Sequence, residues 1–166
     1  KPDREGSTVG ITIVRDPSAW EAALAEAARY DPRVLVEGFV PGREITVGIV
    51  NGRILPAIEI VPKSGFYDYH AKYTAGQTEY VIPVPMDRDI LLRAAEYTRR
   101  AAHAIGLRGA ARLDYRVDPA GNLFFLEANT IPGMTETSLL PKAAKFDGLP
   151  FDDLVEEILS AAGLNK

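Results

Sequence analysis

Two segments of this chain, Arg112-Leu113-Asp114 and Glu127-Ala128-Asn129, flank the turn-forming tetrapeptide Pro119-Ala120-Gly121-Asn122. Counting outward from that turn as an antiparallel hairpin places Asp114 opposite Glu127 and Arg112 opposite Asn129, all on one face. The alternate positions are apolar, and we expect them to face a core: Leu113, Tyr115, Val117, Phe124, Leu126 and Ala128. This hairpin constrains the fold most, because its apolar face has to be covered by another element of the protein.

The polar face of the predicted hairpin carries two opposed carboxylates. At roughly 5 Å, Asp114 and Glu127 repel each other unless a positive charge lies between them. Carboxylate and amide oxygens suit hard cations such as Mg²⁺, so the face is a candidate metal platform. An ordinary solvated sheet face is the alternative, and a β-bulge would change the register on which the argument depends.

The bulk properties exclude several classes of protein. A length of 166 residues predicts one domain that buries roughly 70% of its unfolded surface. The absence of cysteine excludes disulfides, thiolate zinc sites and a cysteine nucleophile. A net charge of -4 with dispersed basic residues argues against a nucleic-acid partner. Since no apolar run could span a bilayer and no signal-peptide pattern opens the chain, we expect a soluble, cytoplasmic protein with no membrane partner.

The order of periodic segments predicts an α+β protein with antiparallel strands and packed helices. Strands are expected at 9–14, 34–40, 44–50 and 54–61. Helices are expected from Asp16-Pro17 to Tyr30, from Asp87 to Gly106, near 139–146 and from about 151 to 162. Residues 62–80 show no period, and loops of that length are usually binding loops or lids.

Two further motifs each have a functional and an ordinary interpretation. The loop Lys1–Thr8 offers a glycine and two hydroxyls that could reach phosphate oxygens, or it is a solvated turn. Glu37 and Glu44 flank residues 38–42, which could present backbone groups to a flat heterocycle and a carboxylate to a ribose. In that case Phe39 packs on the ring. Otherwise, the two carboxylates are exposed strand residues and Phe39 lies in the core.

The aperiodic segment is rich in tyrosine and lysine. Amphipathic rings on such loops tend to close over ligands, and the segment contains Lys63, Tyr67, Tyr69, Lys72 and Tyr73. The two histidines, His70 and His103, have no triad partner at a recognisable spacing, and neither is assigned to catalysis.

Four stretches taken together resemble the D-alanine:D-alanine ligases of the ATP-grasp superfamily. They are Arg4-Glu5-Gly6-Ser7, the segment Phe66 to Tyr73, the hairpin with Asp114 and Glu127-x-Asn129, and the segment Pro132 to Ser138. The resemblance covers essentially the whole chain, residues 1–166, and corresponds to the C-terminal catalytic region of such an enzyme. It implies an ATP-grasp fold and a chain that lacks the amino-terminal domain and the start of the central one. A start at Lys1 without an initiator methionine gives the same expectation of a chain cut from a longer protein.

The resemblance implies a reaction and its metal ligands. ATP phosphorylates the carboxylate of one D-alanine, and the amine of a second attacks the acyl phosphate, giving the dipeptide for peptidoglycan precursor synthesis. Asp114, Glu127 and Asn129 would hold two Mg²⁺ ions on the phosphates, with Glu127 bridging both and Mn²⁺ able to substitute. The bridging charge would also relieve the repulsion between the opposed carboxylates.

The resemblance assigns the remaining site residues in three groups. ATP would contact Lys1, Glu37, Phe39, Val40, Glu44, Tyr67 and Lys72. The two D-alanines would be positioned by Ser7, Tyr73, Ser138 and Leu139. Arg112 and the backbone N–H of Gly133 would stabilise the tetrahedral oxyanion, and preorganised donors of this kind are typically worth about 3 to 4 kcal/mol each.

Three functional hypotheses follow from the resemblance. The first is a D-alanine:D-alanine ligase, homodimeric when complete, whose missing amino-terminal half is its partner and whose isolated C-terminal chain is inactive. The second is a ligase that joins D-alanine to D-lactate or D-serine, against which the loop around Tyr73 argues. The third is a module that binds nucleotide and Mg²⁺ without turnover.

Overall fold

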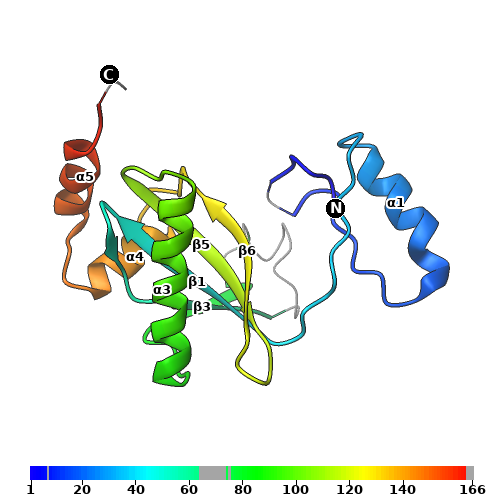
Figure 1. The fold of residues 1–166 in the computed structure, drawn as a ribbon, viewed down its shortest axis with the longest axis horizontal. Helices are drawn as coiled ribbons and strands as arrows, with labels where there is room; N and C mark the ends of the chain where they lie inside the picture. The colour runs from blue at the N-terminus through cyan, green and yellow to red at the C-terminus, as the bar shows by residue number, and fades with distance from the viewer. Residues whose placement is uncertain (7, 64–73, 75, 164–166) are drawn as a thin grey trace. The chain divides into compact units, whose positions relative to one another are not determined.

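The computed structural model describes residues 1–6, 8–63, 74 and 76–163 (Figure 1). The helical elements in this part of the chain are the short 3-10 helix η1 (Pro17–Ala19), α1 (Trp20–Ala28), α3 (Arg88–Ala104), α4 (Leu139–Phe146) and α5 (Phe151–Ser160). The strands are β1 (Arg43–Val50), β2 (Arg53–Ile54), β3 (Ile58–Pro62), β4 (Thr78–Val81), β5 (Ala110–Val117) and β6 (Leu123–Asn129). The chain divides into two compact units, residues 1–39 with 61–79 and residues 40–60 with 80–166.

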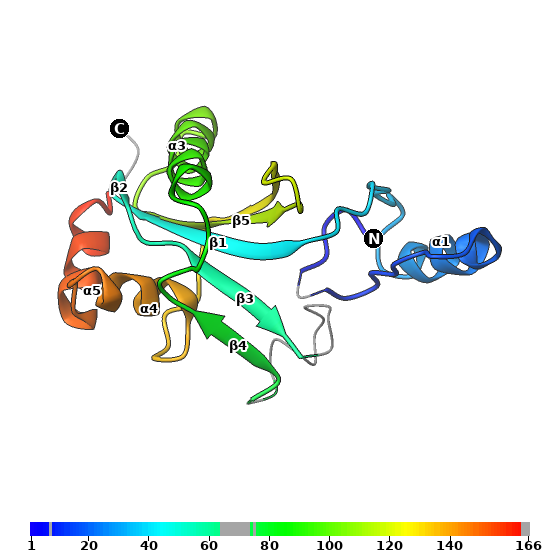
Figure 2. The ribbon, with the colours of Figure 1, turned by 90° about the horizontal axis from the view of Figure 1, so that it is seen from below.

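The strands form one sheet in the order β4-β3-β1-β5-β6, with β2 pairing separately with β1. β1 runs antiparallel to β5 along its whole length, from Arg43 opposite Val117 to Val50 opposite Ala110. β3 and β2 also pair antiparallel with β1. Strands and helices occur in separate layers, as Figure 2 shows for α3, α4 and α5. The predicted α+β architecture with antiparallel strands is confirmed.

One face of the sheet packs on α3. Alternate residues of β1 and β5 point to this side because side chains of a strand alternate between its two faces. α3 begins after Asp87, whose carboxylate caps the helix by accepting from the backbone N–H of Asp89 at 2.9 Å. The buried residues of α3 are small, namely Ala94, Thr98 and Ala102. The buried core of this layer consists of Ile45, Val47, Ile49, Val84, Ala94, Ala102, Ala111, Leu113, Tyr115 and Val117.

The opposite face is covered at one end by α4 and α5. Gly48 of β1 marks the contact, since a Cβ added there would lie 2.8 Å from Leu140 Cδ1 and 3.0 Å from Leu55 Cδ1. A side chain at this position would have to displace the Leu140 and Leu55 side chains. The buried residues that the two helices contribute are Leu139, Leu140, Pro141, Ala143, Ala144 and Leu154.

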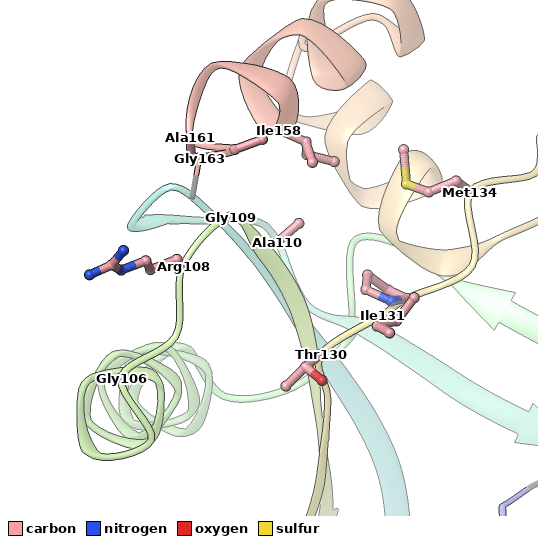
Figure 3. A pocket seen from close by; sticks show the side chains of 12 residues that line it. Gly106, Arg108, Gly109, Ala110, Thr130, Ile131, Met134, Ile158, Ala161 and Gly163 are labelled. Atoms are coloured by element: carbon pink, nitrogen blue, oxygen red, sulfur yellow. The ribbon is translucent and has the colours of Figure 1, made fainter. Parts of the chain in front are cut away.

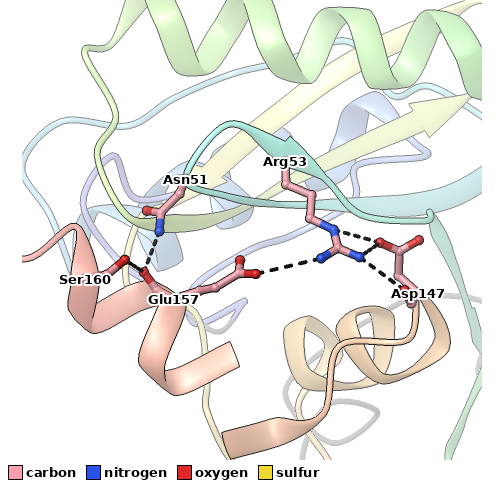
Figure 4. Close-up of polar contacts among 5 residues, drawn as sticks. All are labelled: Asn51, Arg53, Asp147, Glu157 and Ser160. Carbon is pink, nitrogen blue, oxygen red and sulfur yellow. Dashed lines mark hydrogen bonds and ion pairs between the residues drawn. The ribbon is translucent and has the colours of Figure 1, made fainter. Parts of the chain in front are cut away.

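A polar cluster ties the β1–β2 turn to these two helices (Figure 4). Arg53 donates to Asp147 Oδ2 through Nε at 3.0 Å and through NH2 at 2.6 Å, and it also donates to the Asp147 carbonyl. The Asn51 side chain donates to the Glu157 carbonyl, which also accepts from Ser160 Oγ at 2.7 Å. The cluster fixes α4 and α5 against the end of the sheet where β1 ends at Val50.

The unit containing α1 is held by its own polar contacts. Asp16 caps the first helical turn by accepting from Ser18 N at 2.8 Å, as Asp16-Pro17 predicted. The buried Asp31 carboxylate accepts from Arg4 Nε at 2.9 Å and from Arg33 N at 2.9 Å. The Arg4 side chain, followed by the Arg33 N–H, lowers the pKa of Asp31 to about 2.

Three strand predictions are wrong in the described residues. Residues 9–14 form a turn and irregular backbone, because Gly10 takes a φ of +68° close to Tyr30. Residues 34–40 form only a bridge from Val34 to Pro2. The segment predicted as one strand, 54–61, is split into β2 and β3 by Pro56, which has no N–H to donate.

The long aperiodic segment, residues 62–80, includes the start of β4 at Thr78. The helix predictions agree with the structure within a few residues, and α4 begins and ends as predicted. Among the described helices, none has both the length and the apolar character that crossing a bilayer requires.

Candidate functional site

The β5–β6 hairpin has the predicted register where the polar residues lie. Asp114 pairs with Glu127, and Arg112 pairs with Asn129. Nearer the turn, Val117 pairs with Leu123, so the loop is one residue longer than the predicted one, and a β-bulge between Asp114 and Tyr115 restores the count. The predicted pairing of Asp114 with Glu127 is correct because the extra loop residue and the extra bulge residue offset each other.

The longer turn is built by Asp118. Its Oδ1 accepts from Ala120 N at 2.9 Å and from Asn122 N at 2.8 Å, and its Oδ2 accepts from the Asn122 side chain at 2.9 Å. The Asn122 side chain and these backbone N–H groups hold the pKa of Asp118 below its ordinary value. A side-chain turn of this kind competes with the shorter hairpin loop that the sequence suggested.

The bulge also changes which aromatic residue lies opposite Tyr115, and that residue, Phe125, is itself 51% exposed. Phe125 pairs with Tyr115 and meets its ring edge to face at 5.7 Å between centroids, whereas Phe124 lies opposite Arg116 on the polar face. Phe124 and Leu126 are 41% and 37% exposed. Their predicted place in the core is wrong, because one inserted residue reverses the faces of a strand beyond it.

Asp114 is buried and holds three side-chain hydrogen bonds. The Asp114 side chain is only 8% exposed. Arg112 donates to it through two parallel bonds, Nε to Oδ1 and NH2 to Oδ2, each 3.0 Å long. Thr46 Oγ1 on β1 donates to Oδ1 at 2.5 Å. Among the described residues, Oδ1 therefore accepts two bonds and Oδ2 one, so Oδ2 retains the lone pair that a further ligand can use.

The donor set of the hairpin fits a hard cation. Asp114 and Glu127 supply carboxylate oxygens from paired positions, and Asn129 supplies an amide oxygen two residues further along β6. Glu127 is exposed, so its carboxylate is reachable from solvent. No group of three or more His, Cys, Asp and Glu residues suited to a metal occurs in the described part of the chain. An oxygen-only set of two carboxylates and an amide suits Mg²⁺, which completes its shell with water and phosphate.

The segment before β1 lies against the end of β5. Arg116 donates to the carbonyls of Val40 at 3.2 Å and Gly42 at 2.9 Å, and its NH1 lies 3.4 Å from Glu44 Oε2. Gly42 has a φ of +125°, and a Cβ there would lie 2.1 Å from the Val117 carbonyl oxygen. Val40 and Glu44 are therefore held beside the strand that carries Asp114.

Three predicted ATP-binding residues belong to the unit that contains α1. Lys1 Nζ forms an ion pair with Glu37 Oε2 at 2.5 Å. Phe39 is 56% exposed, with the Arg15 guanidinium 5.9 Å from its ring centroid. The alternative that placed Phe39 in the core is wrong, because more than half of this residue is exposed.

The loop between β6 and α4 brings Gly133 and Ser138 together. A Cβ added to Gly133 would lie 2.7 Å from Ser138 Oγ, and that hydroxyl accepts from Thr135 N at 3.0 Å. Leu139 is buried at the start of α4. Since Leu140 packs over Gly48 and Gly48 pairs with Arg112, α4 covers the same sheet face that carries the Arg112 side chain.

An open hollow of about 700 Å³ borders this loop (Figure 3). It lies between the start of β5 at Ala110, the residues after β6 and the end of α5. Pro132 and Met134, which flank Gly133, line it. Asp114 and Glu127 are not among its lining residues, so the hollow adjoins the Arg112 end of the hairpin and not the carboxylates.

Some of the predicted site falls outside the described residues, namely Ser7, Tyr67, Lys72 and Tyr73. Conversely, sequence reasoning missed Thr46 and Arg116. Strand alternation gives only their faces, because Thr46 is two residues from Glu44 and Arg116 is two residues from Asp114, whereas their contacts depend on the pairing of β1 with β5. Each therefore shares the face of a residue that was singled out.

The family model described as D-ala D-ala ligase C-terminus matches residues 1–160. The D-alanine–D-alanine ligase of Syntrophotalea carbinolica is 54% identical over the whole chain, which covers 54% of that protein. That of Citrifermentans bemidjiense is 49% identical over 99% of the chain, again covering 54% of the relative. The chain thus spans about half the length of these relatives.

Solved structures agree with the sequence relatives. The VanG D-Ala:D-Ser ligase from Enterococcus faecalis matches with a TM-score of 0.86 at 32% identity, over 97% of this chain and 48% of that one. The D-alanine–D-alanine ligase from Bacillus anthracis complexed with ATP gives 0.77 at 31% identity, over 90% and 49%. The ATP-grasp ligase fold that the sequence suggested is thereby confirmed. The chain belongs to the D-Ala-D-Ala ligase family, whose C-terminal region it matches.

Proposed function

We propose that this chain is the nucleotide-binding and metal-binding half of a D-alanine:D-alanine ligase of peptidoglycan precursor synthesis. ATP phosphorylates the carboxylate of one D-alanine, and the amine of the second displaces the phosphate to form the dipeptide. The observation that carries the proposal is the pairing of Asp114 with Glu127 beside Arg112, in a chain 54% identical to a protein named D-alanine–D-alanine ligase.

The polar hairpin face provides the electrostatics that phosphoryl transfer needs. Asp114, Glu127 and Asn129 would hold Mg²⁺, or Mn²⁺ in its place, which when bound screens the phosphate charges and draws electron density from the transferred group. The protein's own part is to fix the ligands. Thr46 and Arg112 hold the Asp114 carboxylate in one orientation, so little rearrangement is needed when the ligands bind.

Arg112 has a second role at the acyl end of the site. Its fork to Asp114 uses Nε and NH2, and we propose that the guanidinium held in this way also stabilises the developing oxyanion. The N–H of Gly133 is the second donor that we propose. Gly133 lies on the exposed loop that Ser138 closes, beside the open hollow. Fixed donors of this kind lower the barrier because they do not reorient during the reaction.

The remaining assignments stay predictions within this proposal. Val40 and Glu44 would contact adenine and ribose through a backbone group and a carboxylate, and Phe39 would stack on the purine. The other predicted ATP contacts are Lys1, Glu37, Tyr67 and Lys72, and the predicted D-alanine contacts are Ser7, Tyr73, Ser138 and Leu139. We place the reaction in the cytoplasm, where ATP is available, and the homodimer likewise stays a prediction.

A second candidate is a ligase with a different acceptor. The match to the VanG D-Ala:D-Ser ligase at a TM-score of 0.86 favours it. The proteins named D-alanine–D-alanine ligase are closer in sequence, at 49% to 54% identity against 32%. We therefore propose D-alanine as the acceptor and treat D-serine and D-lactate as competitors.

A chimera tests the function directly. The chain replaces the matching C-terminal 54% of the Syntrophotalea carbinolica ligase, and the purified protein is assayed for ADP and for dipeptide with D-alanine, D-serine and D-lactate. We expect ATP-dependent D-alanyl-D-alanine, with the other acceptors used poorly. A folded, monodisperse chimera that forms no product from ATP and D-alanine would contradict the proposal, and preference for D-serine would establish the second candidate.

A further inference from the structure

Arg116 joins three groups that the proposed nucleoside site contains or adjoins. It donates through Nε to the Val40 carbonyl at 3.2 Å and through NH2 to the Gly42 carbonyl at 2.9 Å, and NH1 lies 3.4 Å from Glu44 Oε2. The side chains of Arg116 and Glu44 are only 19% and 15% exposed. A planar guanidinium can make these contacts at once, whereas a lysine ammonium on a flexible stem cannot reproduce the fork.

A second observation shows that residues 40–42 are seated on β5. A Cβ on Gly42 would lie 2.1 Å from the Val117 carbonyl oxygen and 3.0 Å from Asp118 Cα. Backbone approaches backbone here, and the φ of +125° at Gly42 is one that residues with a side chain rarely adopt. The segment that Arg116 holds therefore rests directly on the strand to which Arg116 belongs.

The same face of β5 carries the proposed acyl and metal residues. Arg112, Asp114 and Arg116 are two residues apart in turn, which separates successive Cα atoms by about 7 Å along the strand. Their proposed partners follow in the same order, namely the reacting carboxylate, the phosphates with their metal ions, and the nucleoside. A nucleotide that lies along β5 would place its phosphates at Asp114 and its nucleoside at Arg116.

We infer that Arg116 is a positioning residue for the nucleoside end of ATP, acting through the backbone of residues 40–42 and through Glu44. This inference rests on the proposed function. Arg116 fixes the backbone at Val40 and the Glu44 carboxylate before the nucleotide arrives, so less conformational entropy is lost on binding. Because Arg116 and Asp114 lie on the same strand, Arg116 also sets the distance from the nucleoside to the metal ligands.

The test compares a nucleotide with a probe that lacks the nucleoside. Calorimetric titrations of the 166-residue chain with Mg-ATP and with Mg-tripolyphosphate are made for the wild type, Arg116→Met and Arg116→Lys. Arg93→Met is the matched control, since Arg93 NH2 also donates to a loop carbonyl, that of Gly121, at 2.7 Å. Thermal unfolding of each variant establishes that it is folded.

Removal of the guanidinium is expected to weaken Mg-ATP binding about tenfold or more, because hydrogen bonds to charged groups are lost. Mg-tripolyphosphate should bind Arg116→Met and the wild type equally. Arg116→Lys should lose nearly as much ATP affinity, and Arg93→Met none. Equal losses for both probes, or no loss with either variant, would overturn the inference. A wild-type chain that binds neither probe would instead contradict the proposed function on which the inference rests.

Discussion

The two faces of β5 differ in what their side chains do, although they alternate along one backbone. Leu113 and Tyr115 are fully buried against α3, where they serve stability. Arg112 and Asp114 point to the other side and hold each other in a pair that has no counterpart in the α3 core. A shift of one residue in register would exchange the two sets. The pairing of β5 with β1 therefore fixes the buried residues of the core and the polar residues of the site at the same time.

The comparison predicts that substitutions on the two faces have separable effects. On the α3 face, stability should fall while the folded fraction keeps its ligand affinity. On the polar face, ligand affinity and chemistry should suffer more than stability. The four substitutions below test this separation.

Glu127→Gln should have the largest effect. It keeps the shape of an exposed side chain and removes one of the two opposed charges, so Mg-ATP affinity or phosphoryl transfer in the chimera should fall at least about a hundredfold. Unfolding in urea should remain close to wild type. Glu96→Gln, on the exposed side of α3, is the control and should change neither measurement. Wild-type metal and nucleotide binding by Glu127→Gln would contradict the metal assignment.

Leu113→Ala tests the opposite face of the same strand. Leu113 is fully buried beneath α3, so its truncation should lower the free energy of unfolding by about 2 to 5 kcal/mol. Under conditions where the variant is folded, its affinity for Mg-tripolyphosphate should equal that of the wild type. Leu92→Ala on α3, where the side chain is exposed, should cost less than about 1 kcal/mol. A loss of ligand affinity as large as that of Glu127→Gln would show that the two faces are not separable.

Thr46→Val should have an intermediate effect. Valine keeps the volume but removes the hydroxyl that donates to Asp114 Oδ1 at 2.5 Å, a bond to a charged group worth about 1.5 to 3 kcal/mol. Because Asp114 keeps its bonds from Arg112, we expect metal affinity to fall more than stability. Electron paramagnetic resonance of bound Mn²⁺ measures the first and urea unfolding the second. Thr46→Ser should restore Mn²⁺ affinity, and equal affinity in all three proteins would remove Thr46 from the site.

The sequence predicted the parts of the fold that depend on local patterns. Helices with caps, such as α3 after Asp87, and strands with strict alternation, such as β1, were found because propensity and burial agree there. Residues 34–40 look like a strand but pair in the described structure only through Val34 and Pro2, and pairing is a property of distant segments. The bulge in β6 was missed because the side-chain contacts of Asp118 close a longer turn than the sequence suggested. The strand pairing then has to shift by one residue between Asp114 and Tyr115.

The candidate site divides along the same line. Asp114 and Glu127 could be predicted because they lie within one hairpin, whose partners are fixed by a short turn. Thr46 and Arg116 depend on the pairing of β1 with β5, between segments 68 and 72 residues apart at their side-chain contacts. Local sequence cannot specify that register, although the alternation of each strand was readable.

Tyr115→Phe should have the smallest effect and a distinctive pH dependence. The Tyr115 hydroxyl lies 2.9 Å from Thr98 Oγ1 inside the α3 core, so its removal should cost about 1 kcal/mol at pH 7. Burial raises the pKa of Tyr115 above its ordinary value near 10. The stability contributed by this group is therefore complete below about pH 10 and is lost as the pH rises from there through the raised pKa, because only the unfolded chain ionises readily.

The difference between wild type and Tyr115→Phe should consequently shrink above pH 10, since phenylalanine has no proton to lose. Urea unfolding at pH 7, 9, 10 and 10.5 measures it. Tyr97→Phe, on the exposed side of α3, is the matched control and should show no such change. A constant difference across this range would mean that the hydroxyl is not held in the desolvated core. Water would then reach the Tyr115 hydroxyl beneath α3, and this face of β5 would not be the dry core that distinguishes it from the Asp114 face.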